Sequence, residues 1–347
     1  MPAVNIDRKA FARLAVRPDL EKLKAVVRDA RRNDRAAREE MLGALTWVAF
    51  SCPGATDPVY DLIATTWLDV ADAPIPEIEP GIAEAPLGAT FWDAYWQVIA
   101  GAEEGYDAST ITAAVASLGG ALDECFGEIA EELARQHRGA DKPTGKNVPG
   151  LIDVPGLASC PEQSLGKRLY DLLTINGFDA EVLDRNAIML GELPPALRYL
   201  NTRILQMHDV WHLVGGYTTD AMHEVAISAF QLAQFGHNYS SMFLAAAGRM
   251  AHERNAAGFG IFFQTVAEAW LHGRENPSFM AIEWEELFDL PVEEIRSRYG
   301  ITAYRSRVPA DLVETLQDGS LLKKVKAVWQ VMKLNRDLQR FPKPVAA

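Results

Sequence analysis

Cysteine is scarce in this chain of 347 residues, and its three cysteines, Cys52, Cys125 and Cys160, lie far apart without a CxxC pair. An odd number of scattered cysteines argues against a disulfide framework and against a thiolate zinc site, and it suits a reducing compartment. Long apolar runs are also lacking, because no window approaches the ~18 uninterrupted apolar residues of a membrane span. The first residues lack the apolar stretch of a secretory signal. We therefore expect a cytoplasmic protein that meets a membrane only from outside.

Basic charge is lacking over most of the chain. The formal net charge is -13, and because both ends are basic the acidic excess is concentrated in residues 41–320. A nucleic-acid reader needs a basic face that displaces the counterions of the phosphates. We therefore expect no nucleic-acid partner.

Strand patterns are few, whereas apolar residues three and four positions apart predict helices over much of the chain. The hydrophobic content of 48% is ample for a packed core. Proline and glycine clusters at 73–86 and 141–156 interrupt the helical pattern. The sequence thus predicts an all-α, multi-helix bundle with a helical N-terminal region of unknown role (1–140), a Pro/Gly-rich linker (141–157), a second helical domain (158–305) and a basic C-terminal helix or tail (306–347).

The segment from Met207 to Glu224 predicts a helix, a turn and a second helix. Gly215-Gly216 supplies a residue that can take positive φ and end the first helix. One of three polar residues can then cap the second helix: Thr218, Thr219 or Asp220.

Four side chains of this segment are candidate metal ligands. His208 and His212 are four residues apart, so they lie about 40° apart around a helix and both imidazoles can reach one ion. Asp209 can be a third ligand or can orient a histidine. Glu224 falls in the first turn of the next helix, where an antiparallel fold brings it beside the end of the first.

Two imidazoles with one or two carboxylates suit Zn²⁺, Fe²⁺, Mn²⁺ or Co²⁺ better than a thiolate-preferring metal. The alternative is that His208 and His212 are core histidines, that Asp209 is their hydrogen-bond partner, and that Glu224 is favoured by the helix dipole. The residues alone leave both interpretations open. Other known signatures fit less well, because a zinc protease needs Glu where Asp209 stands and a di-iron bundle needs ExxH pairs that this chain lacks. An HD phosphohydrolase needs a separate upstream histidine and a downstream aspartate; the only upstream histidine is His137, so phosphate hydrolysis stays a remote alternative.

The pattern H-D-x-x-H-x11-E from His208 to Glu224 resembles the coenzyme Q (ubiquinone) biosynthesis protein 4 family. Further matches cover about residues 160–305, and His223 departs from them, because bacterial relatives usually have a small residue there. The segments that carry the resemblance are Pro161-Glu162, Leu165-Gly166-Lys167-Arg168, Arg203, Gly216 with Thr219, Ala229-Phe230-Gln231-Leu232-Ala233-Gln234, and Trp284 to Ile301.

The resemblance implies an all-α fold with a divalent ion on His208, Asp209, His212 and Glu224, within a metal-binding domain at 158–305. Zn²⁺ is the first expectation, with Fe²⁺, Mn²⁺ or Co²⁺ as alternatives. It also implies a part in ubiquinone biosynthesis, by metal-dependent oxidative decarboxylation of a polyprenyl hydroxybenzoate-type precursor. The expected catalytic residues are His208, Asp209 and Arg203, of which Arg203 is the candidate for pairing with the substrate carboxylate.

A second reading is a non-catalytic, lipid-binding scaffold that gathers other ubiquinone-biosynthesis proteins at the inner face of the cell membrane. The basic segment 321–336 favours such a peripheral surface, because its Lys and Arg lie beside Trp, Val and Leu; a packed helix with a solvated basic face fits it equally. The expected partners are therefore a prenylated aromatic substrate, other ubiquinone-biosynthesis proteins and a peripheral membrane surface, and a homodimer stays open.

Overall fold

The computed structural model describes residues 7–102, 105–106, 108–137, 150–177, 190–254 and 256–340. Within these ranges the regular structure is helical, and the strand-like pairing is confined to an isolated bridge between Ser164 and Pro291. The predicted all-α fold is confirmed. Most of the predicted linker, residues 141–149, lies outside the described residues.

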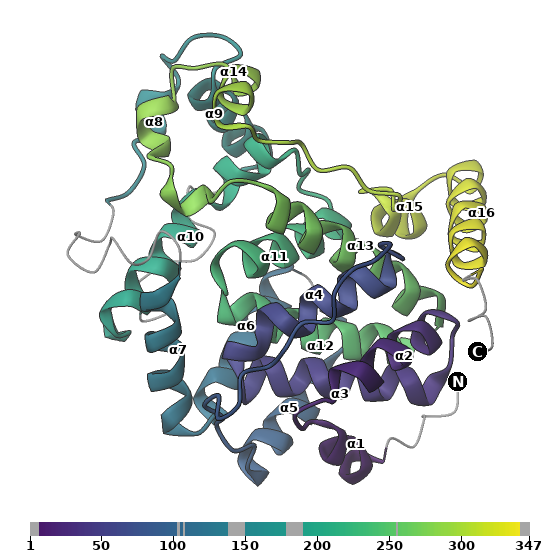
Figure 1. Ribbon diagram of the computed structural model, residues 1–347. Helices are drawn as coiled ribbons and strands as arrows, with labels where there is room; N and C mark the ends of the chain where they lie inside the picture. The colour runs from purple at the N-terminus through teal and green to yellow at the C-terminus, as the bar shows by residue number, and fades with distance from the viewer. Residues whose placement is uncertain are drawn as a thin grey trace.

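The helices fall into an earlier and a later set along the chain (Figure 1). The earlier helices are α1 (Arg8–Leu14), α2 (Leu20–Arg31), α3 (Arg35–Phe50), α4 (Thr56–Trp67), α5 (Ala89–Gly101), α6 (Ala108–Ser117) and α7 (Glu124–Gln136). The later helices are α8 (Val154–Leu157), α9 (Leu165–Asn176), α10 (Pro195–Gly215), α11 (Ala221–Phe235), α12 (Asn238–Arg254), α13 (Ala256–Glu275), α14 (Val292–Tyr299), α15 (Leu312–Asp318) and α16 (Leu321–Leu338).

Aspartates explain where several early helices begin. Asp19 accepts a hydrogen bond from the backbone N–H of Lys22 at 3.2 Å, and Asp34 accepts one from Ala37 at 2.8 Å. An acceptor at this position satisfies a backbone donor that has no partner inside the helix. The residues directly before α2 and α3 therefore determine where these helices begin.

The N-terminal helices and the predicted domain at 158–305 share one hydrophobic core. Helix α3 packs on α12, α4 packs on α13, and α13 packs in turn on α11. Two buried tryptophans bridge these layers, because Trp67 donates to Gln264 at 3.2 Å and Trp270 donates to Asp61 at 2.8 Å. The earlier helices thus support the layer that carries the candidate site, while the division of the chain into regions stays a prediction.

The C-terminal helices attach to the outside of this layer. A small second apolar cluster joins α15 and α16 to α11 and α13, and α16 stands at the edge of the molecule (Figure 1). Its members are Met222, Ile261, Val308, Leu312 and Ala327. Among the helices that the structure describes, none has both the length and the apolar character needed to cross a membrane.

Candidate metal centre

Helix α10 ends where the sequence predicts. Gly216 takes a left-handed conformation with φ of 80°, and the N–H groups of Gly216 and Tyr217 both donate to the carbonyl of His212, at 3.0 and 2.8 Å. A side chain at Gly216 would be strained by the positive φ, and its Cβ would lie 2.9 Å from the Cβ of Ala303. The turn therefore ends α10 three residues after His212 and starts α11 on the other side of the site.

The start of α11 differs from the expectation in one respect. Asp220 is the residue that precedes the helix, but its side chain makes no capping hydrogen bond and instead accepts one from the hydroxyl of Thr218 at 2.6 Å. Glu314 on α15 accepts from the first backbone N–H of the helix, that of Ala221, at 2.8 Å. The cap of α11 thus comes from a distant part of the chain, which local sequence reasoning could not find.

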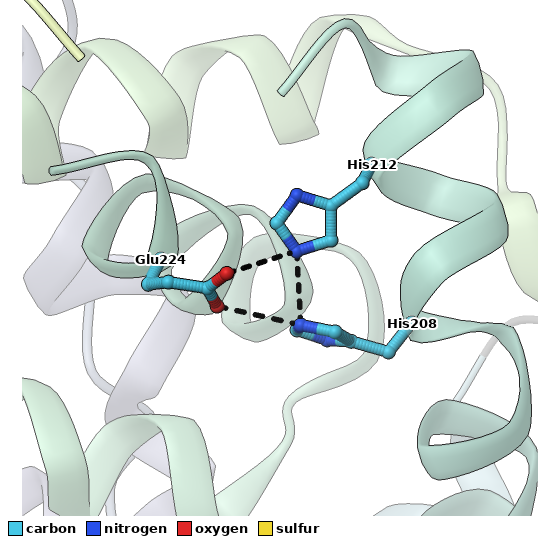
Figure 2. Close-up of side chains that lie close together, drawn as sticks. All are labelled: His208, His212 and Glu224. Carbon is cyan, nitrogen blue, oxygen red and sulfur yellow. Dashed lines mark hydrogen bonds and ion pairs between the residues drawn. The ribbon is translucent and has the colours of Figure 1, made fainter. Parts of the chain in front are cut away.

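Three of the four predicted ligands converge at this turn. His208 and His212 point from adjacent turns of α10 toward the carboxylate of Glu224 on α11 (Figure 2). The two Nε2 atoms lie 3.0 Å apart. Nε2 of His208 lies 3.4 Å from Oε2 of Glu224, and Nε2 of His212 lies 3.4 Å from Oε1 of the same carboxylate.

These separations suit a shared divalent ion. Ligand atoms held at ~2.0–2.2 Å from one ion, with angles between about 90° and 110°, lie roughly 2.9–3.6 Å apart. The observed separations of 3.0 to 3.4 Å fall in that interval. Among the described residues, this is the one group of three or more candidate ligands whose donor atoms lie within 4.8 Å of one another. The donor set therefore fits a metal ion that is bound by two nitrogens and one carboxylate.

The electrostatics of the cluster differ between its two histidines. Burial lowers the pKa of His212 to about 4, with a further contribution from the charge of His208. Burial also acts to lower the pKa of His208, but the hydrogen bond and charge of Glu224 and the charge of Asp209 outweigh it, so that pKa is raised. Burial acts to raise the pKa of Glu224, and the two histidines outweigh it, so that pKa is lowered. In the metal-free cluster Glu224 thus favours the charged form of His208, whereas burial favours the neutral form of His212.

Asp209 lies beside the cluster and does not join it. Its side chain is buried, and the group of converging ligand atoms consists of His208, His212 and Glu224. Burial raises the pKa of the Asp209 carboxyl, and the charge of His208 acts in the opposite direction. Its predicted role as a direct ligand stays a prediction, and its position suits an electrostatic effect on His208.

Arg203 leaves α10 on another face. It lies five positions before His208, which turns its side chain about 140° around the helix axis from that histidine. Its buried guanidinium donates to both carboxylate oxygens of Glu285, with a distance of 2.8 Å from Nη2 to Oε2, and to Oε1 of Gln206 at 2.9 Å. Its predicted contact with a substrate carboxylate stays a prediction. In the structure the Arg203 side chain is hydrogen-bonded to Glu285.

The remaining histidines near the turn have other partners. Nδ1 of His223 accepts from the backbone N–H of Thr218 at 2.8 Å. Nδ1 of His272 lies 2.6 Å from the hydroxyl of Tyr217, and its Nε2 lies 2.7 Å from the carbonyl of Thr302. These contacts brace the turn around the cluster, and they do not place either ring among the converging ligand atoms.

Sequence reasoning missed a polar partner of His208. Gln231 is buried on α11, and its amide lies 2.9 Å from Nδ1 of His208, on the side of the ring that faces away from Glu224. The two glutamines, Gln231 and Gln234, in the otherwise apolar stretch from Ala229 to Phe235 were the available signal. A buried polar side chain needs a partner, and here that partner is a ring of the cluster.

The comparison with known proteins gives a match over the part of the chain that contains the candidate site. Residues 140–305 match the family model described as coenzyme Q (ubiquinone) biosynthesis protein Coq4. A mitochondrial ubiquinone biosynthesis protein coq4 of Talaromyces stipitatus is 27% identical over 180 residues, which cover 50% of this chain and 59% of that protein. A mitochondrial COQ4 homologue of Mus musculus is 25% identical over 151 residues, which cover 44% of this chain and 55% of that protein. The chain therefore spans little more than half the length of these curated relatives.

A crystal structure from Nostoc punctiforme, of a protein provisionally assigned to ubiquinone biosynthesis, is similar with a TM-score of 0.49 and 24% identity, over 62% of this chain and 98% of that one. The family match contains His208, His212 and Glu224. Residues 140–305 of this chain are therefore similar to the family described as coenzyme Q (ubiquinone) biosynthesis protein Coq4.

Proposed function

We propose that this protein acts in ubiquinone biosynthesis through a divalent metal ion, with Zn²⁺ as the first candidate, held by His208, His212 and Glu224. The observation that carries the proposal is the convergence of two Nε2 atoms and one carboxylate from two helices at 3.0 to 3.4 Å. Neutral imidazoles and a carboxylate are ligands that Zn²⁺, Fe²⁺, Mn²⁺ and Co²⁺ accept in proteins.

The proposed reaction is oxidative decarboxylation of a polyprenyl hydroxybenzoate-type precursor. The ring loses its C1 carboxylate as carbon dioxide and gains a hydroxyl, which is a two-electron oxidation, so the reaction also needs dioxygen or another electron acceptor. A bound divalent ion would hold an oxygen of the substrate and stabilise negative charge that develops on the ring.

The chain's own residues would position and protonate the substrate. Glu224 stays ionised between the two imidazoles because their hydrogen bond and charges lower its pKa. Asp209, whose pKa is raised by burial, is the candidate for carrying a proton to or from the reacting groups. Arg203 can meet a substrate carboxylate only by exchanging its contact with Glu285.

The first experiment measures metal content by elemental mass spectrometry on the wild type and on the His208→Ala and Glu224→Ala variants. His223→Gln is a matched control, because His223 lies next to Glu224 but binds Thr218 instead. Near-stoichiometric metal in the wild type and the control, and its loss from variants that remain folded by circular dichroism, supports the site. A folded wild type that takes up no metal after reconstitution rules it out.

A second measurement tests the reaction itself. The metal-loaded wild type is incubated with a prenylated 4-hydroxybenzoate, dioxygen and a reductant, and both carbon dioxide and the hydroxylated product are quantified. The enzymatic proposal expects turnover that the His208→Ala change alone abolishes. Absence of turnover from the metal-loaded protein favours a scaffold.

The scaffold alternative is favoured by the surface of α16. Ala327 and Leu338 are buried on its inner side, whereas its outer side exposes large apolar residues. The same helix carries four lysines, at 323, 324, 326 and 333. Lysines beside exposed apolar side chains suit an anionic lipid surface. The exposed apolar residues are Leu321, Leu322, Val325, Val328, Trp329 and Met332.

Vesicle sedimentation tests this second proposal. The protein is mixed with vesicles that contain or lack phosphatidylglycerol, and binding should require the anionic lipid. The double change Leu322→Gln and Trp329→Gln should release the protein, whereas the conservative change Gln317→Asn at an exposed position of α15 should not. Equal binding of wild type and the double variant would remove α16 from the proposed membrane surface. The scaffold proposal further predicts that such surface variants no longer bind other ubiquinone-biosynthesis proteins.

A further inference from the structure

A series of hydrogen-bonded polar side chains, buried at Gln231, Ser240 and His237 and partly buried at Asn201, leads away from His208 and returns to α10. It starts at Nδ1 of His208, which lies 2.9 Å from the amide of Gln231 on α11. The other end of that amide lies 3.5 Å from the hydroxyl of Ser240 on α12, and that hydroxyl lies 2.9 Å from Nδ1 of His237. Nε2 of His237 lies 3.1 Å from Oδ1 of Asn201 on α10.

The last link has a fixed direction. Nδ2 of Asn201 donates to the carbonyl of Leu197 at 2.8 Å, and a carbonyl can only accept. Oδ1 of Asn201 therefore faces His237, so the facing Nε2 must carry a proton. Because Asn201 and His208 are seven residues apart, they lie on the same face of α10, about two turns from each other.

The donor at Nε2 of His237 fixes the donor and acceptor of each further hydrogen bond toward Gln231. Burial lowers the pKa of His237 to about 3, so this ring is neutral and a proton on Nε2 leaves Nδ1 as an acceptor. The Ser240 hydroxyl must then donate to His237, which leaves its lone pairs for the amide of Gln231. Only Nε2 of that amide can donate to them.

This result decides how Gln231 meets His208. The structure turns Nε2 of Gln231 toward His208, but the two ends of an amide exchange by a 180° rotation, and the hydrogen-bond network determines which end lies where. If Nε2 donated to His208, Ser240 would donate to Gln231, His237 would donate to Ser240, and two acceptors would meet at Asn201. The opposite orientation satisfies every link.

We infer that this directional chain presents Oε1 of Gln231 to His208, holds a proton on Nδ1 of that ring, and so reserves its Nε2 for the metal ion. The inference rests on the proposed metal site. A histidine ligand with its second ring nitrogen hydrogen-bonded is fixed in tautomer and in orientation. Gln231, Ser240, His237 and Asn201 are positioning residues, because they act through His208.

The first test needs no metal. Long-range ¹H–¹⁵N spectra of the metal-free protein, with the His208 signals identified by a His208→Gln variant, report whether Nδ1 carries a proton and how fast that proton exchanges with water. We expect a protonated Nδ1 with slow exchange. A lone pair on Nδ1 overturns the inference, whether or not the wild type binds metal.

The second test changes the group that Gln231 presents to Nδ1 of His208. Gln231→Glu keeps an acceptor opposite Nδ1, so Zn²⁺ affinity, measured by competition with a chelating dye, should stay equal or rise. Gln231→Leu removes the acceptor and should weaken Zn²⁺ binding about 10- to 100-fold. A large loss in the folded Gln231→Glu variant contradicts the assigned direction.

The third test acts at a distance. The hydrogen-bonded links from His237 to His208 run through Ser240 and Gln231, and His237→Phe frees the Ser240 hydroxyl to donate to Gln231 and so removes the fixed direction of these links. The Nδ1 proton of His208 should then exchange faster, and Zn²⁺ affinity should fall a few-fold. Ser241→Ala is the matched control, because it deletes the neighbouring buried hydroxyl on α12, which lies outside the chain. Equal exchange in the wild type and His237→Phe would overturn the role of the distant links. Failure of the wild type to bind Zn²⁺ would instead refute the metal site and leave the spectra to decide the direction.

Discussion

Glu131 on α7 caps the helix that carries both site histidines. Its Oε2 accepts a hydrogen bond from the backbone N–H of Leu197 at 2.9 Å, and its Oε1 accepts one from Ala196 at 3.1 Å. Pro194, which precedes α10, offers no side-chain cap of its own. Glu131 lies outside the segment that matches the family, as does Glu314, which caps α11. The N- and C-terminal regions therefore complete the two helices from which the ligands come.

Removing the Glu131 carboxylate should destabilise the protein. Glu131→Ala leaves two buried N–H groups without an acceptor, so we expect a loss of about 1–3 kcal/mol in the free energy of unfolding. Glu131→Gln keeps one acceptor oxygen and should lose less. Urea titration measures both, with the exposed Glu128→Ala on the same helix as the control. Equal stability of Glu131→Ala and wild type would show that water or another group replaces the cap.

Removing the Glu314 cap should loosen the start of α11 near Glu224. Glu314→Ala leaves the N–H of Ala221 without its acceptor, and we expect faster amide exchange over 221–224 and a destabilisation of about 1 kcal/mol. Hydrogen exchange with mass spectrometry measures the first effect. Asp318→Ala, at the exposed end of α15, is the control. Unchanged exchange at the start of α11 would mean that the contact does not hold this helix.

Local patterns predicted much of the site. The apolar period of three and four gives the helices, Gly216 ends α10, and the four-residue spacing of His208 and His212 puts both rings on one face. Glu224 arrives opposite them because a tight turn leaves α11 little choice of direction. Each of these outcomes depends on residues that lie close together in the sequence.

The rest depends on residues that are distant in the sequence. The caps from Glu131 and Glu314 come from 66 and 93 positions away, and Gln231 reaches His208 across 23 positions. Arg203 meets Glu285 across 82 positions, and no period or turn signal in the sequence pairs them. Such contacts follow from how the helices pack, which side-chain volumes decide and local propensities do not.

Acid should destabilise the protein partly through His252. This ring is buried, its two nitrogens have no hydrogen-bond partner among the described residues, and its Nε2 lies 3.5 Å from a carboxylate oxygen of Glu39. Burial lowers the pKa of His252 to about 3, and the charges of Arg249, Arg38 and Arg35 act in the same direction. These effects outweigh the single carboxylate, so the ring is neutral in the folded state.

The sign follows from proton uptake. Below pH 6.5, the ordinary pKa of about 6.5 lets His252 bind a proton in the unfolded chain, whereas the buried ring of the folded protein stays neutral. The unfolded state therefore binds more protons, and the free energy of unfolding falls as pH falls. Between pH 6.5 and 4.5 we expect this residue to account for about 2 kcal/mol of lost unfolding free energy. Urea titrations of the metal-free protein at several pH values measure it. His252→Leu should flatten the curve, and an unchanged slope would show that His252 is protonated in the folded protein.

Arg203 can be tested as a structural residue and as a substrate-binding residue in one set of variants. If its main role is the contact with Glu285, Arg203→Ala should cost about 1–3 kcal/mol of unfolding free energy, because it breaks a pair whose arginine is buried. The double variant Arg203→Ala with Glu285→Ala should cost less than the sum of the single changes. Metal content should stay that of the wild type, since Arg203 and the metal ligands leave α10 on different faces.

A conservative change separates the two roles. Arg203→Lys keeps the positive charge but cannot donate to both oxygens of Glu285 in the same planar geometry, so a structural role predicts a measurable loss of stability. A substrate-binding role predicts instead that Arg203→Lys raises the KM for an aromatic acid substrate, while Glu285→Gln, which releases the guanidinium, lowers it. Stability that is unchanged in Arg203→Lys together with a raised KM would assign Arg203 to the substrate; lost stability with an unchanged KM would assign it to the fold.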